Sequence, residues 1–179
     1  MIQMSNTSLI IHIKLFVCFL LLLLSKQTNA QTVWISPKYH YSIEIPKGFV
    51  KENPSVGQNV DFKAAFDRIN TIVIVVKKIP DDAFRYSLWD IYGDLNIYFN
   101  NLEVEGIQRY GYYKIIDYGK FVVSGSDALW YDVEREMGFV RYCQTKKGNY
   151  IYTFTLAYFN GETKFWDTVW IRFLKQIKF

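Results

Sequence analysis

The chain has 179 residues, of which 50% are hydrophobic, and its 21 basic and 17 acidic side chains give a formal net charge of +4. That length suits a single domain with its own core. Because basic residues alternate with acidic ones, with no run longer than Lys77-Lys78 or Lys146-Lys147, the charge pattern excludes a nucleic-acid footprint.

The first thirty residues have the order of a secretory signal peptide. Lys14 precedes an apolar run from 15 to 24, and Thr28 and Ala30 fit the small-residue cleavage pattern. The run is about half the roughly 20 residues that a membrane span needs, which disfavours the alternative of an uncleaved anchor. We therefore expect export to the periplasm or the extracellular space, a single mature domain of residues 31–179, and no stable membrane span after cleavage.

Cleavage would remove Lys14 and Lys26 and leave a net charge of +2, with one cysteine, Cys143, and one histidine, His40. A domain with one cysteine has no internal disulfide, and one Cys with one His excludes the usual zinc sites. We expect Cys143 to be a buried thiol within a strand, with an interchain bridge as the alternative. The sequence has no phosphate-binding glycine loop and no metal-binding helix motif, so no cofactor is expected.

Three strands are predicted in the first half of the mature chain. Residues 39–45 alternate apolar and polar side chains, and Pro46 with Gly48 ends the pattern. Residues 60–66 form a second, short strand. Residues 71–79 are rich in β-branched side chains and almost continuously apolar, which predicts a central strand buried on both faces.

A helix is predicted next, because apolar residues recur at three or four positions through 88–102, after Ser87 and Asp90 in the spacing of a capping box. Residues 112–124 return to strand character, with a break near Gly119. The chain ends in a helix over 162–177 that carries one wide apolar stripe.

Residues 127–159 predict three antiparallel strands joined by two tight turns, Met137-Gly138 and Lys147-Gly148. This register places Arg141 opposite Glu134 and Phe154. Alternation gives one face Trp130, Asp132, Glu134, Arg141, Cys143, Tyr152 and Phe154. It gives the other face Leu129, Tyr131, Val133, Val140, Tyr142, Ile151, Thr153, Thr155 and Ala157.

Both faces are largely apolar, so both need a cover. The small side chains Thr153, Thr155 and Ala157 leave room for a helix, and we expect the C-terminal helix to pack there. The predicted fold class is α+β: an antiparallel β-sheet covered by helices, as an α/β/α sandwich.

Several features stand in an order known from one fold family. They are Tyr41-Ser42-Ile43 with Pro46, Gly48 and Phe49, the strand around Asp61, the strand from Thr71 to Val76 before a long helix, and the apolar C-terminal helix. Together they resemble the PsbP-like fold of PsbP, Mog and DcrB-like exported proteins. Phe49 departs from the family, which often has Trp there, and Arg172 stands where a small hydroxyl residue is common. The resemblance implies a sandwich fold and a binding role, and it transfers no functional residue.

The predicted sheet brings one set of chemically useful side chains to the same face. In a ligand-binding interpretation Arg141 holds an anionic group while aromatic rings stack on the ligand. The alternative is a cross-strand ion pair of Arg141 with an acidic neighbour. The candidate ligand-binding residues are Trp130, Asp132, Glu134, Arg141 and Tyr152.

A catalytic interpretation would need His40 as the base for Ser42, Ser36 or Cys143, and no nucleophile motif surrounds it. The acidic residues at 81, 82, 90 and 94 match no calcium loop and fit a solvated helix entrance better than a metal site. No catalytic residue and no metal ligand is therefore predicted.

Aromatic residues are abundant, and five of them fall where the pattern does not clearly bury them: Trp34, Trp89, Tyr110, Tyr112 and Tyr113. Exposed aromatics favour protein or sugar partners. We expect an exported, non-enzymatic binding or accessory protein, whose partner is another envelope or secreted protein. The alternatives are a carbohydrate-binding module that uses the exposed aromatics and a hydrolase that uses His40.

Overall fold

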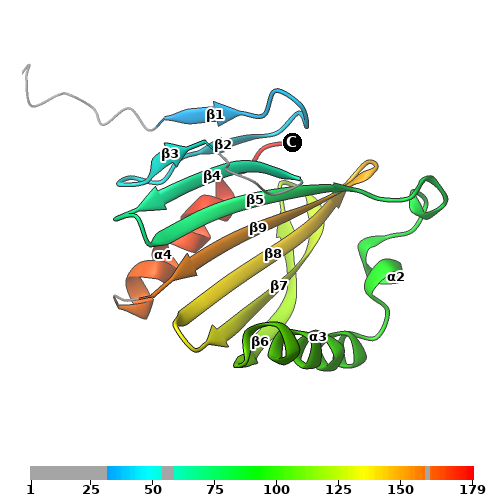
Figure 1. Ribbon diagram of the computed structural model, residues 1–179. Helices are drawn as coiled ribbons and strands as arrows, with labels where there is room; N and C mark the ends of the chain where they lie inside the picture. Colours follow the sequence, from blue (N-terminus) through cyan, green and yellow to red (C-terminus); the bar gives the residue numbers. More distant parts are fainter. Residues whose placement is uncertain (1–31, 54–58, 160–161) are drawn as a thin grey trace, which may run out of the picture. The chain divides into compact units, whose positions relative to one another are not determined.

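A seven-stranded antiparallel sheet, in the order β3-β4-β5-β9-β8-β7-β6, organises the fold, and a separate two-stranded ribbon pairs β1 with β2 (Figure 1). The computed structural model describes residues 32–53, 59–159 and 162–179, within one compact unit that spans Thr32–Phe179. The predicted signal peptide, residues 1–30, lies outside the described residues.

The strands are β1 (Val33–Ile35), β2 (Ser42–Glu44), β3 (Val50–Glu52), β4 (Val60–Phe66), β5 (Asn70–Lys78), β6 (Tyr113–Val123), β7 (Ser126–Arg135), β8 (Gly138–Lys147) and β9 (Tyr150–Tyr158). The helices are η1 (Asp81–Ala83), α2 (Leu88–Tyr92), α3 (Leu95–Tyr110) and α4 (Thr163–Lys175). Sheet and helices together confirm the predicted α+β class.

The two faces predicted for residues 127–159 are confirmed, but the predicted register is wrong by two residues. Arg141 pairs with Asp132 on β7 and with Leu156 on β9. The turns are therefore Glu136-Met137 and Gly148-Asn149. Gly138 belongs to β8, where a Cβ would come within 2.5 Å of a carbonyl oxygen of β9. The glycine thus permits a close approach of strands and does not mark the turn.

Helix α4 covers the face of the sheet that carries the large aromatic side chains, so its predicted place over Thr153, Thr155 and Ala157 is wrong. The ring of Phe173 lies 6.2 Å from that of Phe154, and Trp166 stacks on Tyr158 at 5.4 Å. Interdigitated rings bury more apolar area than a helix over small residues would, which favours this face. The helix is an integral part of the larger core cluster.

Helices α2 and α3 cover the other face over β6, β7 and β8, with Phe99 and Leu88 in a smaller buried cluster (Figure 1). The predicted single helix is two, because Gly93 adopts φ 65° and Asp94 caps α3. The predicted capping box of Ser87 with the third helical residue is confirmed at the start of α2.

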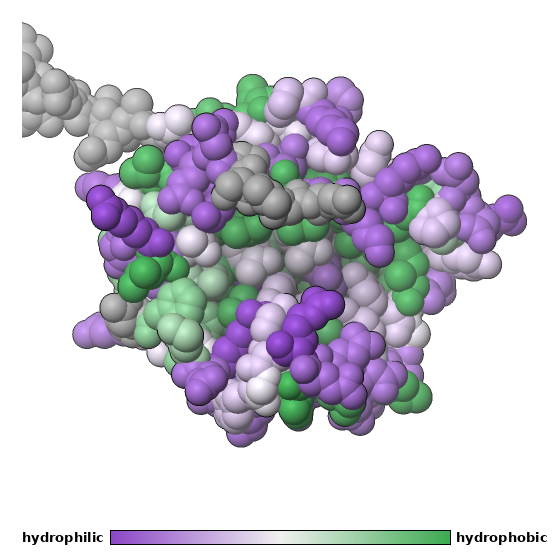
Figure 2. Space-filling view, in the orientation of Figure 1, coloured by the Kyte–Doolittle hydropathy of each residue, from purple (hydrophilic) through white to green (hydrophobic). Residues whose placement is uncertain are grey.

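Part of this second face has none of the described helices above it. Thr153, Thr155 and Ala157 of β9 and Val73 and Val75 of β5 are only half-buried. Figure 2 looks onto this face, where the pale surface over the middle strands lies between hydrophilic and hydrophobic patches. The prediction that the 71–79 strand is buried on both faces is therefore right for one face only, although β5 is a central strand as predicted.

Strand β6 is eleven residues long and forms one edge of the sheet. Its irregularity lies between Ile115 and Asp117 rather than at the predicted break near Gly119. At this bulge the backbone N–H of Ile115 donates a hydrogen bond of 2.8 Å to the carboxylate of Glu103 on α3. The bond ties α3 to the edge strand.

The remaining short elements differ in length from their predictions. Strand β4 has the predicted bounds, Val60–Phe66, whereas the predicted strand 39–45 is reduced to β2. His40 precedes β2 with a left-handed φ of 54°, which interrupts the extended chain.

Candidate ligand cavity

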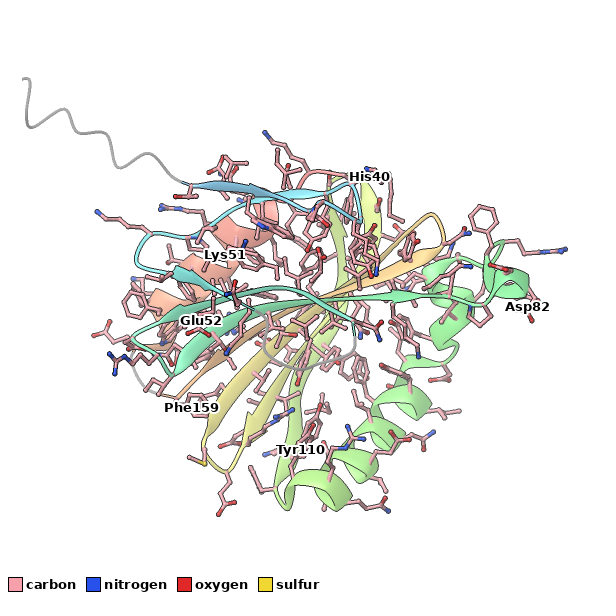
Figure 3. All side chains as sticks on the ribbon, turned by 45° about the horizontal axis from the view of Figure 1, so that its top comes forward. His40, Lys51, Glu52, Asp82, Tyr110 and Phe159 are labelled. Carbon is pink, nitrogen blue, oxygen red and sulfur yellow. The ribbon has the colours of Figure 1, made fainter. Side chains whose placement is uncertain are left out.

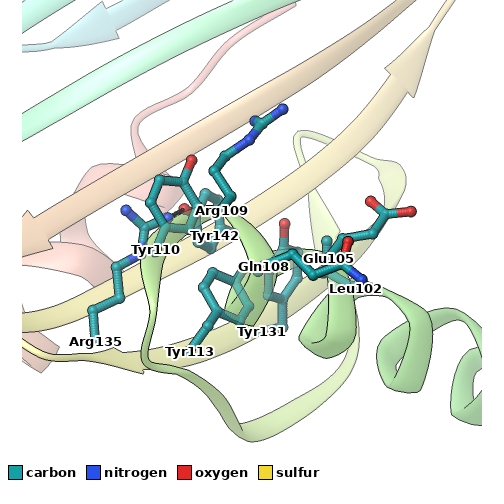
Figure 4. A pocket seen from close by; sticks show the side chains of 10 residues that line it. Leu102, Glu105, Gln108, Arg109, Tyr110, Tyr113, Tyr131, Arg135 and Tyr142 are labelled. Carbon is teal, nitrogen blue, oxygen red and sulfur yellow. Dashed lines mark hydrogen bonds between the residues drawn. The ribbon is translucent and has the colours of Figure 1, made fainter.

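A cavity of about 580 Å³ lies between the C-terminal half of α3 and strands β6, β7 and β8 (Figure 4). Helix α3 contributes Leu102, Glu105, Gly106, Gln108, Arg109 and Tyr110. Strands β6, β7 and β8 contribute Tyr113, Tyr131, Arg135 and Tyr142. We call this site the tyrosine cavity. Its volume is in the range of small-molecule sites in proteins.

Gly106 lets α3 approach the edge strand at the cavity. A Cβ at this position would lie 2.3 Å from the ring of Tyr113, which is itself 4% exposed. The helix therefore presents bare backbone to the buried ring, and the next turn of α3 carries Arg109 and Tyr110 to the mouth of the cavity. The following Gly111 ends the helix and leads the chain into β6.

Arg135, the last residue of β7, is the central polar group of the cavity. Its Nη2 donates a hydrogen bond of 2.8 Å to the hydroxyl of Tyr142, and its guanidinium carbon lies 4.1 Å from the ring centre of Tyr110. Its Nε is buried and has no hydrogen-bond partner among the described residues. A buried N–H without a partner destabilises a fold, so such a group calls for a functional explanation.

The tyrosines make the wall aromatic and keep it neutral. Tyr131 and Tyr142 stack with ring centres 4.6 Å apart and planes 14° from parallel. Burial raises the pKa of Tyr131 well above its ordinary value of 10.0, and it also raises the pKa of Tyr142 although Arg135 opposes that shift. Both hydroxyls therefore stay protonated at neutral pH and can donate hydrogen bonds.

The sequence indicated a different group of site residues, and the structure does not bring all five together. Arg141 and Asp132 meet at 3.4 Å, so the ion pair that was the alternative interpretation is present. Glu134 accepts a hydrogen bond from the Tyr112 hydroxyl at 3.0 Å, and the Tyr152 hydroxyl donates to a backbone carbonyl at 3.0 Å within the core. Trp130 packs partly buried against the α4 cluster. Ligand binding by these residues stays a prediction.

Arg141 in fact joins two carboxylates. Its Nη1 lies 2.5 Å from Asp167 of α4, in addition to the contact with Asp132. Burial raises the pKa of Asp132 to about 6, against the opposing effect of Arg141. This charge cluster links α4 to the sheet.

His40 is exposed at the turn before β2, far from Tyr110 in the view of Figure 3. Within residues 32–53, 59–159 and 162–179 no hydrogen bond joins it to Ser36, Ser42 or Cys143. Cys143 is buried and free as expected, and burial raises the pKa of its thiol to about 12.

The five aromatics singled out in the sequence have different environments. Tyr110 and Tyr113 line the tyrosine cavity, so the pattern contained part of the site. Trp34 packs partly buried against the core, and Tyr112 is exposed. Trp89 lies in a second surface hollow, but the ammonium of Lys120 sits 4.5 Å from its ring centre. A sugar would have to displace that ammonium to stack on this ring.

Nowhere among the described residues do three or more His, Cys, Asp or Glu side chains gather in a group that could hold a metal ion. No helix in the same residues is long and apolar enough to cross a membrane.

At the level of sequence, no family model and no curated protein matches this chain. Solved structures do match its fold. Cyanobacterial PsbP (CyanoP) from Synechocystis sp. PCC 6803 has a TM-score of 0.62 and 14% identity over 84% of this chain and 94% of that one. LpqN of Mycobacterium tuberculosis, involved in cell envelope biogenesis, has a TM-score of 0.51 and 10% identity over 85% and 86%. The chain therefore has the PsbP-like fold that its sequence resembled.

Proposed function

We propose that this chain is an exported, non-catalytic binding protein that holds a small ligand in the tyrosine cavity. The observation that carries the proposal is Arg135, a partly buried cation that has no carboxylate partner among the described residues and lines a cavity walled by tyrosine rings. Proteins rarely leave such a group buried unless water or a ligand satisfies it.

The chemistry of the cavity supports binding rather than catalysis. Its wall contains no histidine and no cysteine, and burial raises the pKa of Tyr131 and Tyr142, which holds these two hydroxyls in the protonated form. Glu105 is the one carboxylate among the lining residues, so the wall offers no pair of carboxylates and no carboxylate with a histidine for acid and base steps.

The proposal that the protein is exported and has an accessory role is supported by the N-terminal sequence and by a protein of the same fold. Residues 1–30 have the order of a signal peptide, and LpqN, which shares the fold, is described as involved in cell envelope biogenesis. A partner among envelope or secreted proteins remains part of the proposal, since the half-open face beside the cavity leaves room for one.

A thermal-shift screen tests the proposal. The protein, expressed with its own export signal, is melted with a panel of aromatic carboxylates, organic phosphates, amino acids and neutral sugars. We expect at least one compound to raise the melting temperature, because a ligand that binds only the folded state stabilises it.

The variant Gln108→Trp should abolish that shift by filling the cavity from the wall of α3. Ile107→Trp is the matched control, since Ile107 lies on the same helical turn, is exposed and does not line the cavity. If no compound acts, or if the shift survives in Gln108→Trp, the cavity is not the site. A shift from sugars alone that requires Trp89 would favour the carbohydrate-binding alternative.

A further inference from the structure

We propose that the ligand of the tyrosine cavity is a planar anion, a small molecule with an aromatic or similarly flat body and one carboxylate or phosphate group. The inference rests on the proposed binding function and specifies its ligand class.

The first step is the charge of Arg135. The described part of the chain supplies no carboxylate partner for this guanidinium, whereas Arg141 on the next strand meets both Asp132 and Asp167. A partly buried charge without a counterion is unfavourable, and the planar fork of arginine fits the two oxygens of a carboxylate or phosphate. An anionic ligand would supply the missing counterion.

The second step is that the fork is already held in place. The hydrogen bond to Tyr142 and the ring of Tyr110 at 4.1 Å fix the guanidinium plane. Because the Tyr142 hydroxyl accepts from Arg135, its own O–H remains available as a donor. The Tyr142 hydroxyl and the Arg135 guanidinium thus lie side by side among the lining residues, and the side chains that hold them lose little freedom when a ligand binds.

The third step is the distribution of the other charges. Arg109 lies 6.0 Å from the ring centre of Tyr110, the same ring that the Arg135 guanidinium meets at 4.1 Å. Glu105 lies on the other side of the pocket in Figure 4 and forms no ion pair with a described residue. The end of the cavity at Arg135 is thus the positive one, which places the anionic group there.

The fourth step concerns the body of the ligand. Four tyrosine rings and the bare backbone of Gly106 line the space, and aromatic walls favour flat rings that stack or meet them edge to face. The Tyr131 hydroxyl makes no hydrogen bond to the described residues and can meet one polar atom on that ring.

The experiment compares probes of equal shape and different charge by titration calorimetry. They are 2-naphthoate, its neutral amide 2-naphthamide, and 2-naphthyl phosphate. We expect one of the two anions to bind at least about tenfold more tightly than the amide, because only an anion forms charge-assisted hydrogen bonds with the Arg135 guanidinium. The tighter anion identifies the head group as carboxylate or phosphate.

Variants connect the preference to the cavity. Arg135→Gln should reduce the anion preference to less than about threefold, and Arg85→Gln, an exposed cation outside the cavity, should leave it unchanged. If Arg135→Gln does not fold, Arg109→Gln serves in its place and should weaken both anions by about two- to fivefold without weakening the amide.

Equal binding of anions and amide, abolished by Gln108→Trp, would overturn the anion inference and leave the proposed function intact. An anion preference that survives in both cavity arginine variants would overturn it as well, and so would failure of all three probes when other compounds of the panel bind. If nothing in the panel binds, the proposed function itself fails.

Discussion

The two faces of the large sheet are covered in different ways. On one face α4 inserts Trp166, Trp170 and Phe173 between the aromatic side chains of the strands, and the result is a continuous buried cluster. On the other face α3 joins a smaller cluster, its last turns border a cavity of about 580 Å³, and part of β9 has no helix above it. Apolar rings that fill all space favour stability, whereas tyrosines around a gap leave polar groups for a ligand.

The largest expected effect comes from opening the α4 face. Trp170→Ala should lower the free energy of unfolding by about 3–5 kcal/mol, because it removes a side chain that is 5% exposed within the cluster. Denaturant titration measures the change. Lys175→Ala, at an exposed position of the same helix, should change it by less than about 0.5 kcal/mol. Similar losses in both variants would mean that α4 is not the stabilising layer.

Gly106→Ala tests the α3 face. In an ordinary helix interior this change stabilises by up to about 1 kcal/mol, but here the new methyl group would collide with the buried ring of Tyr113. We expect a net loss of about 1–3 kcal/mol together with loss of ligand binding. Asn101→Ala, exposed on the same helix, provides the propensity control. A more stable Gly106→Ala protein would show that α3 can shift away from the sheet at no cost.

The smallest effect concerns the charge cluster under α4 and depends on pH. Asp132 has a pKa raised from 3.8 to about 6, chiefly by burial, with Arg141 opposing the shift and Asp117 and Asp167 adding to it. Between these two pKa values the folded state binds more protons than the unfolded state, so this group lowers stability as the pH rises from about 4 to 6.

Asp132→Asn should therefore stabilise the protein at pH 7 by about 1 kcal/mol, a value reduced for solvent screening, and should have little effect at pH 4. Thermal melts of both proteins across this pH range measure the difference in their stability. The contributions of the other titrating groups are common to both proteins and cancel in that difference. A variant that is less stable at pH 7 than at pH 4, relative to the native chain, would show that the ion pair outweighs the burial of the carboxylate.

Alternation along the strands was enough to predict both faces of residues 127–159, because a shift by two positions leaves every side chain on its own face. Alternation could not predict which residues pair across the strands, because the pairing depends on which two residues form each turn. Gly138 resembled a turn glycine, although its role is to let β9 approach. Arg141 therefore meets Asp132 rather than Glu134.

The face chosen by α4 and the cavity under α3 depend on tertiary packing. Small side chains on β9 suggested room for a helix, yet burial of large rings decided the matter on the opposite face. The cavity combines Arg135 and Tyr142 with a helix that ends 25 positions before Arg135, and no local pattern links them. In the sequence, the cavity was indicated only by Tyr110 and Tyr113, two aromatic residues that the pattern did not clearly bury.

The contact between Glu103 and the bulge of β6 bears on how readily the protein aggregates at high concentration. An eleven-residue outer strand with free backbone groups is a template on which other chains can add strands and begin to form amyloid. Here a carboxylate takes the N–H of Ile115, the bulge breaks the regular spacing, and exposed Lys114 and Lys120 repel an identical edge. The same hydrogen bond that seats α3 thus removes one free donor from the outer edge of the longest strand.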